Sequence, residues 1–212
     1  MSSADDSPPD AAELVLPVGH SLGMAASGPV VEVRLGAAVE QLGPAEFALW
    51  SMAHSDPAGG RGPWGPAGLL DAAERVELEG AAGHLEALLQ RGLLARAVPG
   101  TPSARALADT VRLLPLTTGL GNDHQSPQVY RMGRPDRLLA VGSSATYDLF
   151  QWAHMESSLW RACEAAATVA ARVGATDPGL VEPEELLTGL LTGLHALLGT
   201  NAVCLDTWGV AP

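Results

Sequence analysis

Residues 19–23 read GHSLG, which matches the G-x-S-x-G pattern in which some hydrolases expose a nucleophilic serine. Such a serine lies on a sharp turn between a strand and a helix, within reach of a histidine base. Too few residues precede Ser21 to form the central sheet of such an enzyme, and a Gly-Pro pair at 28–29 would interrupt the helix that should follow. We therefore predict that Leu22 and Gly23 mark an ordinary turn, and a serine hydrolase is kept only as the third functional alternative.

Two histidines have a carboxylate two positions later, His54 before Asp56 and His154 before Glu156. A metal site usually needs three or four converging ligands, and the sequence has no cluster with such spacing. We therefore predict neither a metal nor a cofactor. The expected role of each histidine is to end a helix, where the C-terminal dipole favours a cation.

The same pattern occurs twice along the chain. Pro17 matches Pro115, 98 residues later (115 − 17 = 98), and the Leu-Gly pair and the Pro that follow keep this offset. Farther on, FALWSMAH at residues 47–54 matches YDLFQWAH at 147–154 in its aromatic, Leu, Ala and His positions. A repeat of roughly 100 residues is too long for a solenoid unit and indicates a duplicated small domain.

Apolar alternation predicts short strands, and 3.6-residue spacing predicts helices, in both halves. In the first half we expect strands at 13–18, 30–35 and 38–42 and helices at 45–54, 67–75 and 79–91. In the second half we expect strands at 111–116, 128–132 and 138–141 and helices at 144–154, 159–172 and 183–198. The predicted fold class is α+β, with tandem winged-helix-like domains, each a small antiparallel sheet followed by three helices.

Composition divides the chain into four segments. Residues 1–12 are expected to form a disordered acidic tail, 13–98 the first repeat, 99–110 a linker rich in small residues, and 111–208 the second repeat. With 47% hydrophobic residues, each half can bury a core. The tail does not resemble a signal peptide and no stretch approaches the ~20 apolar residues that cross a bilayer, so we expect a cytoplasmic protein with no membrane partner.

The charge balance bears on the partner. Twelve basic and 24 acidic residues give a net charge of −12, which repels phosphate backbones and favours a peptide or protein with a cationic patch. A winged-helix transcriptional regulator is the leading alternative function, but its recognition helix needs cations. The candidate helix at 76–91 carries three Glu, and that at 182–198 carries three Glu with no Arg or Lys. Duplex DNA is therefore not an expected partner. Association of the chain into a homo-oligomer is kept as an alternative.

Apolar positions and turns in the first half resemble those of the PqqD-like domain, which recognises the precursor peptides of ribosomally made natural products. The matching segments read VRL at 33–35, VEQLGP at 39–44, FALW at 47–50 and a Leu-rich helix running into Gly92-Leu93-Leu94. The resemblance covers about residues 13–98 and, more weakly, 111–205. The loop that begins at Ser55 is longer and richer in Gly than in that family.

The resemblance implies a binding function without chemistry. Members of the family hold a leader peptide as an added strand beside the third strand, in a groove bordered by the last helix. In this sequence, the groove of the first half would be formed by Val39, Glu40, Gln41, Leu42, Leu85, Leu88 and Leu89. That of the second half would be formed by Leu138, Leu139, Ala140, Val141, Leu187, Leu190 and Leu191. The expected function is a non-enzymatic accessory protein in the maturation of such peptides.

Overall fold

The computed structural model describes residues 12–26, 28–59, 64–123 and 125–208 and shows an α+β fold with small antiparallel sheets and, within these residues, eight α-helices. The first half contains a two-stranded sheet of β1 (Leu14–Pro17) and β5 (Leu94–Ala97). It also contains a three-stranded sheet of β2 (His20–Met24), β3 (Val31–Leu35) and β4 (Ala38–Leu42). Between β4 and β5 lie α1 (Pro44–Met52), α2 (Pro66–Arg75) and α3 (Ala81–Gln90).

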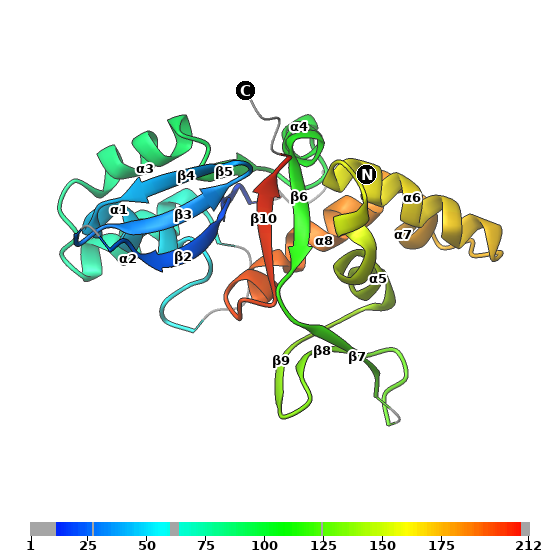
Figure 1. Cartoon of the computed structure of the whole chain (residues 1–212). Helices are drawn as coiled ribbons and strands as arrows, with labels where there is room; N and C mark the ends of the chain where they lie inside the picture. Colours follow the sequence, from blue (N-terminus) through cyan, green and yellow to red (C-terminus); the bar gives the residue numbers. More distant parts are fainter. Residues whose placement is uncertain (1–11, 27, 60–63, 124, 209–212) are drawn as a thin grey trace, which may run out of the picture.

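The second half repeats this order of elements (Figure 1). Its two-stranded sheet consists of β6 (Val111–Pro115) and β10 (Val203–Thr207), and its three-stranded sheet of β7 (Thr118–Asn122), β8 (Tyr130–Arg134) and β9 (Arg137–Gly142). Its helices are α5 (Ser144–Trp152), a 3-10 turn (Ala153–Met155), α6 (Leu159–Arg172), the short α7 (Pro178–Val181) and α8 (Pro183–Leu198).

Both halves contain a glycine-bearing bulge that the sequence reasoning took for a turn. The GHSLG segment forms strand β2, whose pairing with β3 shifts between Ser21 and Gly23. Strand β7 shifts in the same place, between Gly119 and Gly121. Gly23 has φ of 100° and Gly121 has φ of 76°, a region that favours glycine, so these glycines allow the strand to bulge. The predicted turn is therefore wrong, because the chain continues as a strand through the bulge.

Strand β1 lies between two hydrophobic cores. Val15 packs in the core of the first half together with Leu49, whereas Leu14, Leu16 and Val18 pack in the core of the second half. All four residues of β1 are buried. The alternation of side chains along a strand explains this division, because successive residues point to opposite faces. The two halves are therefore held together by a shared strand.

The segment predicted as a linker carries a helix instead. Helix α4 (Pro102–Thr110) begins with Pro at its first turn and buries Ala104, Leu107 and Ala108. Proline is favoured at this position, and the three apolar residues follow helical spacing, so they pack on the core of the second half. The predicted N-terminal tail lies outside the described residues except for Ala12.

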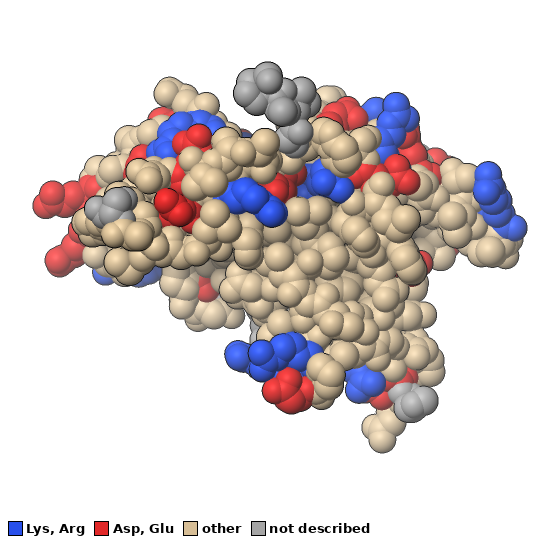
Figure 2. All heavy atoms as spheres, viewed as in Figure 1, with Lys and Arg blue, Asp and Glu red and all other residues tan. Residues whose placement is uncertain are grey.

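Charged side chains are unevenly placed on the surface. Figure 2 shows a broad uncharged area on the face seen there, with Arg and acidic residues along its upper margin and at the lower tip. The β8–β9 hairpin, where Arg134 pairs with Asp136 at 3.2 Å, and the connection between β7 and β8 both lie at this lower end (Figure 1). None of the described helices has the length and apolar character needed to cross a bilayer.

Candidate functional site

Within the described residues the edge strands of the two three-stranded sheets are β2 and β4 in the first half and β7 and β9 in the second. Of these, β4 and β9 are the strands at which the sequence predicts an added peptide strand. In β4, Val39 and Gln41 are exposed and Glu40 is half-buried. In β9, Leu138 and Val141 are exposed. An edge strand can offer unpaired backbone N–H and C=O groups to an incoming strand. Their position in the sheets therefore makes β4 and β9 candidate sites for the addition of a peptide strand.

Much of the predicted groove lies in the cores instead. Seven of the predicted contact residues are buried: Leu42, Leu85, Leu88, Ala140, Leu187, Leu190 and Leu191. The reason is packing, because α3 packs against α1, and α8 packs against α5 and α6. Each helix therefore buries its apolar stripe against another helix. Leu89 and Leu139 are half-buried beside the cores.

A single arginine closes the β4 edge. Arg91, which follows α3, donates from Nη2 to the backbone oxygen of Gln41 and to the Glu40 carboxylate, both at 2.9 Å. Its Nη1 forms an ion pair with Glu46 at 3.0 Å. The guanidinium thus covers a backbone carbonyl of the edge strand and joins α3 to the sheet. A peptide could add along β4 at this point only after the arginine moved.

The β9 edge has no corresponding arginine. Asn201 takes the place of Gly92 at the end of the last helix, and both have a positive φ, of 54° and 71°. The last helix of each half therefore ends before a residue with positive φ, and the match places Thr200 where the first half has Arg91. The Thr200 hydroxyl donates to carbonyls of its own helix. Among the described residues no side chain hydrogen-bonds to the backbone of β9.

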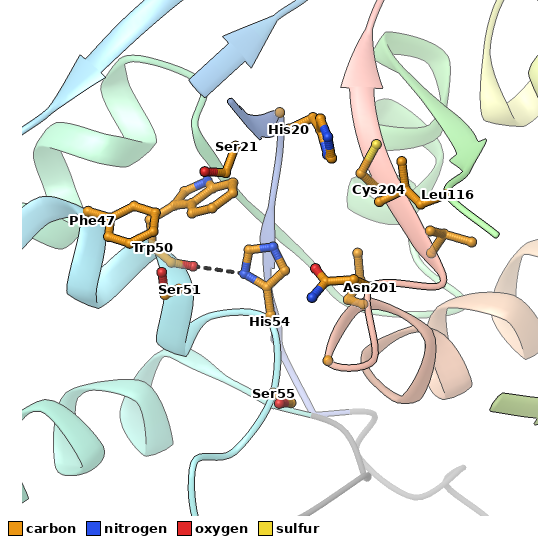
Figure 3. A pocket seen from close by; sticks show the side chains of 14 residues that line it. His20, Ser21, Phe47, Trp50, Ser51, His54, Ser55, Leu116, Asn201 and Cys204 are labelled. Atoms are coloured by element: carbon orange, nitrogen blue, oxygen red, sulfur yellow. Dashed lines mark hydrogen bonds between the residues drawn. The ribbon is translucent and has the colours of Figure 1, made fainter. Parts of the chain in front are cut away.

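A pocket of about 460 Å³ lies at the seam between the halves (Figure 3). Residues from β2, α1, the end of α8 and β10 line it, and none of these lining residues is an Asp, Glu or Arg. Gly19 forms part of its wall and donates its N–H to the Leu205 carbonyl of the other half at 2.7 Å. A Cβ at Gly19 would lie 2.7 Å from the Arg34 carbonyl oxygen on β3, so the close approach of these two segments within the first half requires glycine.

His54 presents a bare nitrogen to this pocket. Its Nδ1 lies 3.1 Å from the Trp50 carbonyl, which can only accept, so Nδ1 carries the proton. Burial lowers the pKa of His54 to about 4, and the ring is therefore neutral at pH 7. Figure 3 shows the second nitrogen, Nε2, turned away from that carbonyl toward the pocket interior. The predicted cationic role is wrong because burial outweighs the helix dipole, and Nε2 is an acceptor for a ligand N–H or O–H group.

The pocket lacks the geometry of a serine hydrolase. Ser21 lies on strand β2, and β3 follows it where a nucleophile elbow would require a helix. Among the described residues no hydrogen bond joins Ser21 to His20 or His54, and the Ser21 hydroxyl accepts from the Gly23 N–H at 3.4 Å. Burial also raises the pKa of the Cys204 thiol to about 12, so this lining residue stays protonated and is a poor nucleophile.

Replacing Ser21 by alanine is expected to change the free energy of unfolding by less than about 0.5 kcal/mol, because the hydroxyl makes only one long hydrogen bond. A fluorophosphonate probe is expected to leave the native protein unlabelled. Urea denaturation and intact-mass spectrometry measure these outcomes. Stoichiometric labelling that disappears in Ser21→Ala would identify a nucleophile and contradict the interpretation.

The two matched histidines have different surroundings. His154 is exposed in the 3-10 turn after α5, whereas His54 is half-buried at the seam. Asp56 does not face His54, since its carboxylate accepts from the Ala58 N–H at 2.8 Å. Within the described residues no group of three or more His, Cys, Asp or Glu side chains is placed to hold a metal ion. The repeated His therefore supports the duplication but not a repeated site.

Two charged residues that position these surfaces were missed by sequence reasoning. Arg91 is one, and Asp206 is the other: it is buried, and it accepts from Arg34 at 3.1 Å and from the Gly36 N–H at 2.7 Å across the halves. The partners of both residues are remote in sequence. Local sequence patterns therefore do not predict these contacts. The sign they leave in the sequence is a single charged residue within an apolar segment.

Comparison with protein-family models, with curated protein sequences and with solved structures finds no significant match to this chain.

Proposed function

We propose that this chain is a non-enzymatic binding protein that holds an extended peptide along the free edge of β9. The observation that carries this proposal is the state of that edge. On the side of β9 opposite β8, no strand of the described residues pairs with it, and its exposed side chains Leu138 and Val141 are 55% and 51% accessible. Long apolar edges are normally protected in proteins, because they pair readily with other chains. Strand β9 has a bulge at Leu139 and a charge at Arg137, which restrict pairing, and the remaining apolar part of its edge is suited to binding a strand.

The contrast between the two halves supports the assignment to β9. Arg91 covers a carbonyl of β4, whereas Thr200 leaves β9 untouched. The duplication thus supplies one edge that is closed by its own chain and one that is available. We infer that one peptide binds per chain, at the second half.

The charge near β9 favours a particular peptide. Arg137 begins the strand and has no ion pair among the described residues, while Arg131 and Arg134 each lie near an Asp. A carboxylate on the peptide would meet Arg137, and apolar side chains would follow it along Leu138 and Val141. The recognised segment is therefore an extended apolar peptide with an acidic residue at one end, in contrast to the cationic partner that the net charge alone suggests.

We further propose that each half is a winged-helix-like, PqqD-like unit that serves in the maturation of a ribosomally made peptide. The order of a three-stranded sheet followed by helices supports this proposal, with α1 to α3 in the first half and α5 to α8 in the second. A role in reading DNA is less well supported, because α8 buries eight residues and carries Glu184 and Glu185 in its first turn. A helix with these features presents neither a free face nor cations to a phosphate backbone.

The test is a selection of displayed 15-residue peptides against the full chain, followed by calorimetry with the selected peptide. The double variant Leu138→Lys/Val141→Lys should weaken binding by more than about tenfold, because edge lysines oppose strand addition. Hydrogen exchange of β9 amides should slow when the peptide is added. The matched control is Val39→Lys, at a similarly exposed position on the closed edge, and its affinity should be unchanged.

Two results would contradict the proposal. One is unchanged affinity in the folded double variant, which would exclude β9. The other is loss of binding in Val39→Lys alone, which would assign the peptide to β4 after displacement of Arg91.

A further inference from the structure

A groove of about 560 Å³ runs between α5 and α6, on the right of Figure 1. Most of the side chains that line it are apolar. Four large ones are strongly exposed there: Trp152 (60%), Met155 (69%), Val169 (59%) and Val173 (80%). Contiguous exposed apolar surface of this kind is unusual on a monomer and marks a binding surface.

In the first half, core side chains fill the position that corresponds to this groove. Helices α2 and α6 end with the same backbone hydrogen bond, from Leu78 N–H to the Ala73 carbonyl and from Ala175 N–H to the Ala170 carbonyl. Each helix also ends in a residue with positive φ, Glu77 or Gly174. Aligning the helices on these ends gives a residue-by-residue correspondence between the two grooves.

The correspondence shows that apolar side chains are missing from the second half. Leu69, which is fully buried in the first core, corresponds to Ala166, and Leu78, which packs on that core, corresponds to Ala175. Both alanines line the groove, as does Leu149, the counterpart of the buried Leu49. The groove is therefore a core-forming surface that lacks two leucine side chains, and a ligand that fills it must supply apolar groups of similar size.

The charged residues at the groove rim indicate which charged groups the ligand should carry. These residues are Asp148 and Glu156. Burial raises the pKa of the Asp148 carboxyl, and this carboxyl has no hydrogen bond or ion pair among the described residues. Asp148 is an exposed residue at the groove rim, and a cation placed beside its carboxylate would pair with a partly desolvated negative charge. A second copy of this chain does not provide such a ligand, because two chains of net charge −12 repel each other.

We propose that the α5–α6 groove binds an amphipathic helix of a partner protein, with its apolar face in the groove and Lys or Arg side chains beside Asp148 and Glu156. The groove extends from Ala162 to Val173, about 16 Å at 1.5 Å per residue, which accommodates about three turns of helix. This site is separate from the β9 edge and does not depend on peptide binding there.

The probe is a fluorescein-labelled 18-residue amphipathic helix made of Leu and Lys, added to the full chain at about 0.15 M salt. Its matched control replaces every Lys with Glu and keeps the apolar face. Fluorescence anisotropy should show saturable binding of the Lys peptide, with affinity at least about tenfold higher than that of the Glu peptide.

Variants separate binding in the groove from general attraction to an acidic protein. Ala166→Leu/Ala175→Leu restores the leucines of the first half and keeps every charge, so it should weaken binding at least about tenfold. Asp148→Asn should weaken binding about threefold or more, while Asp71→Asn on the exposed surface of α2 should have no effect. If the leucine variant does not fold, Val169→Arg provides the test, because it places a repelling cation at an exposed position in the groove.

Unchanged affinity in the folded leucine variant, or in Val169→Arg, would overturn the proposal. Equal binding of the Lys and Glu peptides would do the same. Light scattering that shows a dimer of this chain, abolished by Ala166→Leu/Ala175→Leu, would also overturn it, because the groove would then be occupied by a second copy.

Discussion

Replacing Leu16 by alanine is expected to lower the free energy of unfolding by about 2–5 kcal/mol, although the side chain touches no proposed binding surface. Leu16 is fully buried and belongs to β1 of the first half, but it packs in the core of the second half. Its removal leaves a cavity between the halves. We expect the two halves to unfold together, in one cooperative transition that shifts to lower denaturant concentration.

Urea denaturation followed by circular dichroism and tryptophan fluorescence measures this effect. The matched control is Leu22→Ala on β2, where the side chain is 52% exposed and the expected change is below about 0.5 kcal/mol. Two separate transitions, with only one of them moved by Leu16→Ala, would show that the halves fold independently and that β1 does not couple them.

This coupling is a feature that the sequence could not reveal. Strict alternation in residues 31–35 correctly predicts β3, and the helical spacing of Phe47, Leu49 and Trp50 correctly predicts α1. These patterns are local. The pairing of β1 with β5, almost 80 residues later, depends on tertiary packing, and so does the choice of core for each face of β1.

Three elements, β2, β7 and α4, were missed for a different reason. The glycines and polar residues of β2 and β7 suggest turns, because a bulged strand contains residues with positive φ that ordinary strands avoid. Helix α4 was hidden by a composition typical of linkers. Its signal was nevertheless present, as Pro102 at the helix start followed by Ala104, Leu107 and Ala108 at helical spacing.

The candidate sites were predictable only as edges. The edge strands β4 and β9 coincide with the third strand expected in each half. Helical periodicity, however, identifies an apolar stripe without showing what it packs on. Leu85 and Leu88 therefore entered the predicted groove although they form the core. The features that distinguish the halves are the Arg91 contacts and the loss of leucines from α6, and both become visible only when the halves are compared in three dimensions.

We expect the protein to lose stability as the pH falls from about 6.5 to 4, because a histidine is buried at the seam between the halves. Burial lowers the pKa of His54 from 6.5 to about 4 in the folded state, whereas the unfolded chain has the ordinary value. Between these values the unfolded chain takes up a proton that the folded chain refuses. Stability is therefore fully present above pH 6.5, falls as pH decreases, and changes no further through this group below about 4. The full contribution is about 3 kcal/mol.

His195 acts in the same direction. It is buried at the seam, its Nε2 lies 2.9 Å from the Val15 carbonyl, and burial lowers its pKa. Protonating either ring would place a charge between the halves, and within the described part of the chain no carboxylate acts on either ring to offset it. The seam should therefore be the part of the molecule that weakens first in mild acid.

Urea denaturation at pH 7 and pH 4.5 of the wild type and of His54→Gln tests this expectation. The variant should lose less stability on acidification, by about 2 kcal/mol, because glutamine keeps an N–H donor for the Trp50 carbonyl and does not titrate. The matched control is His154→Gln, the counterpart in the repeat, whose exposed side chain should leave the pH dependence as in the wild type. If His54→Gln and the wild type lost equal stability, His54 would be accessible to protons in the folded state. The halves would then be less tightly joined at the seam than the structure indicates.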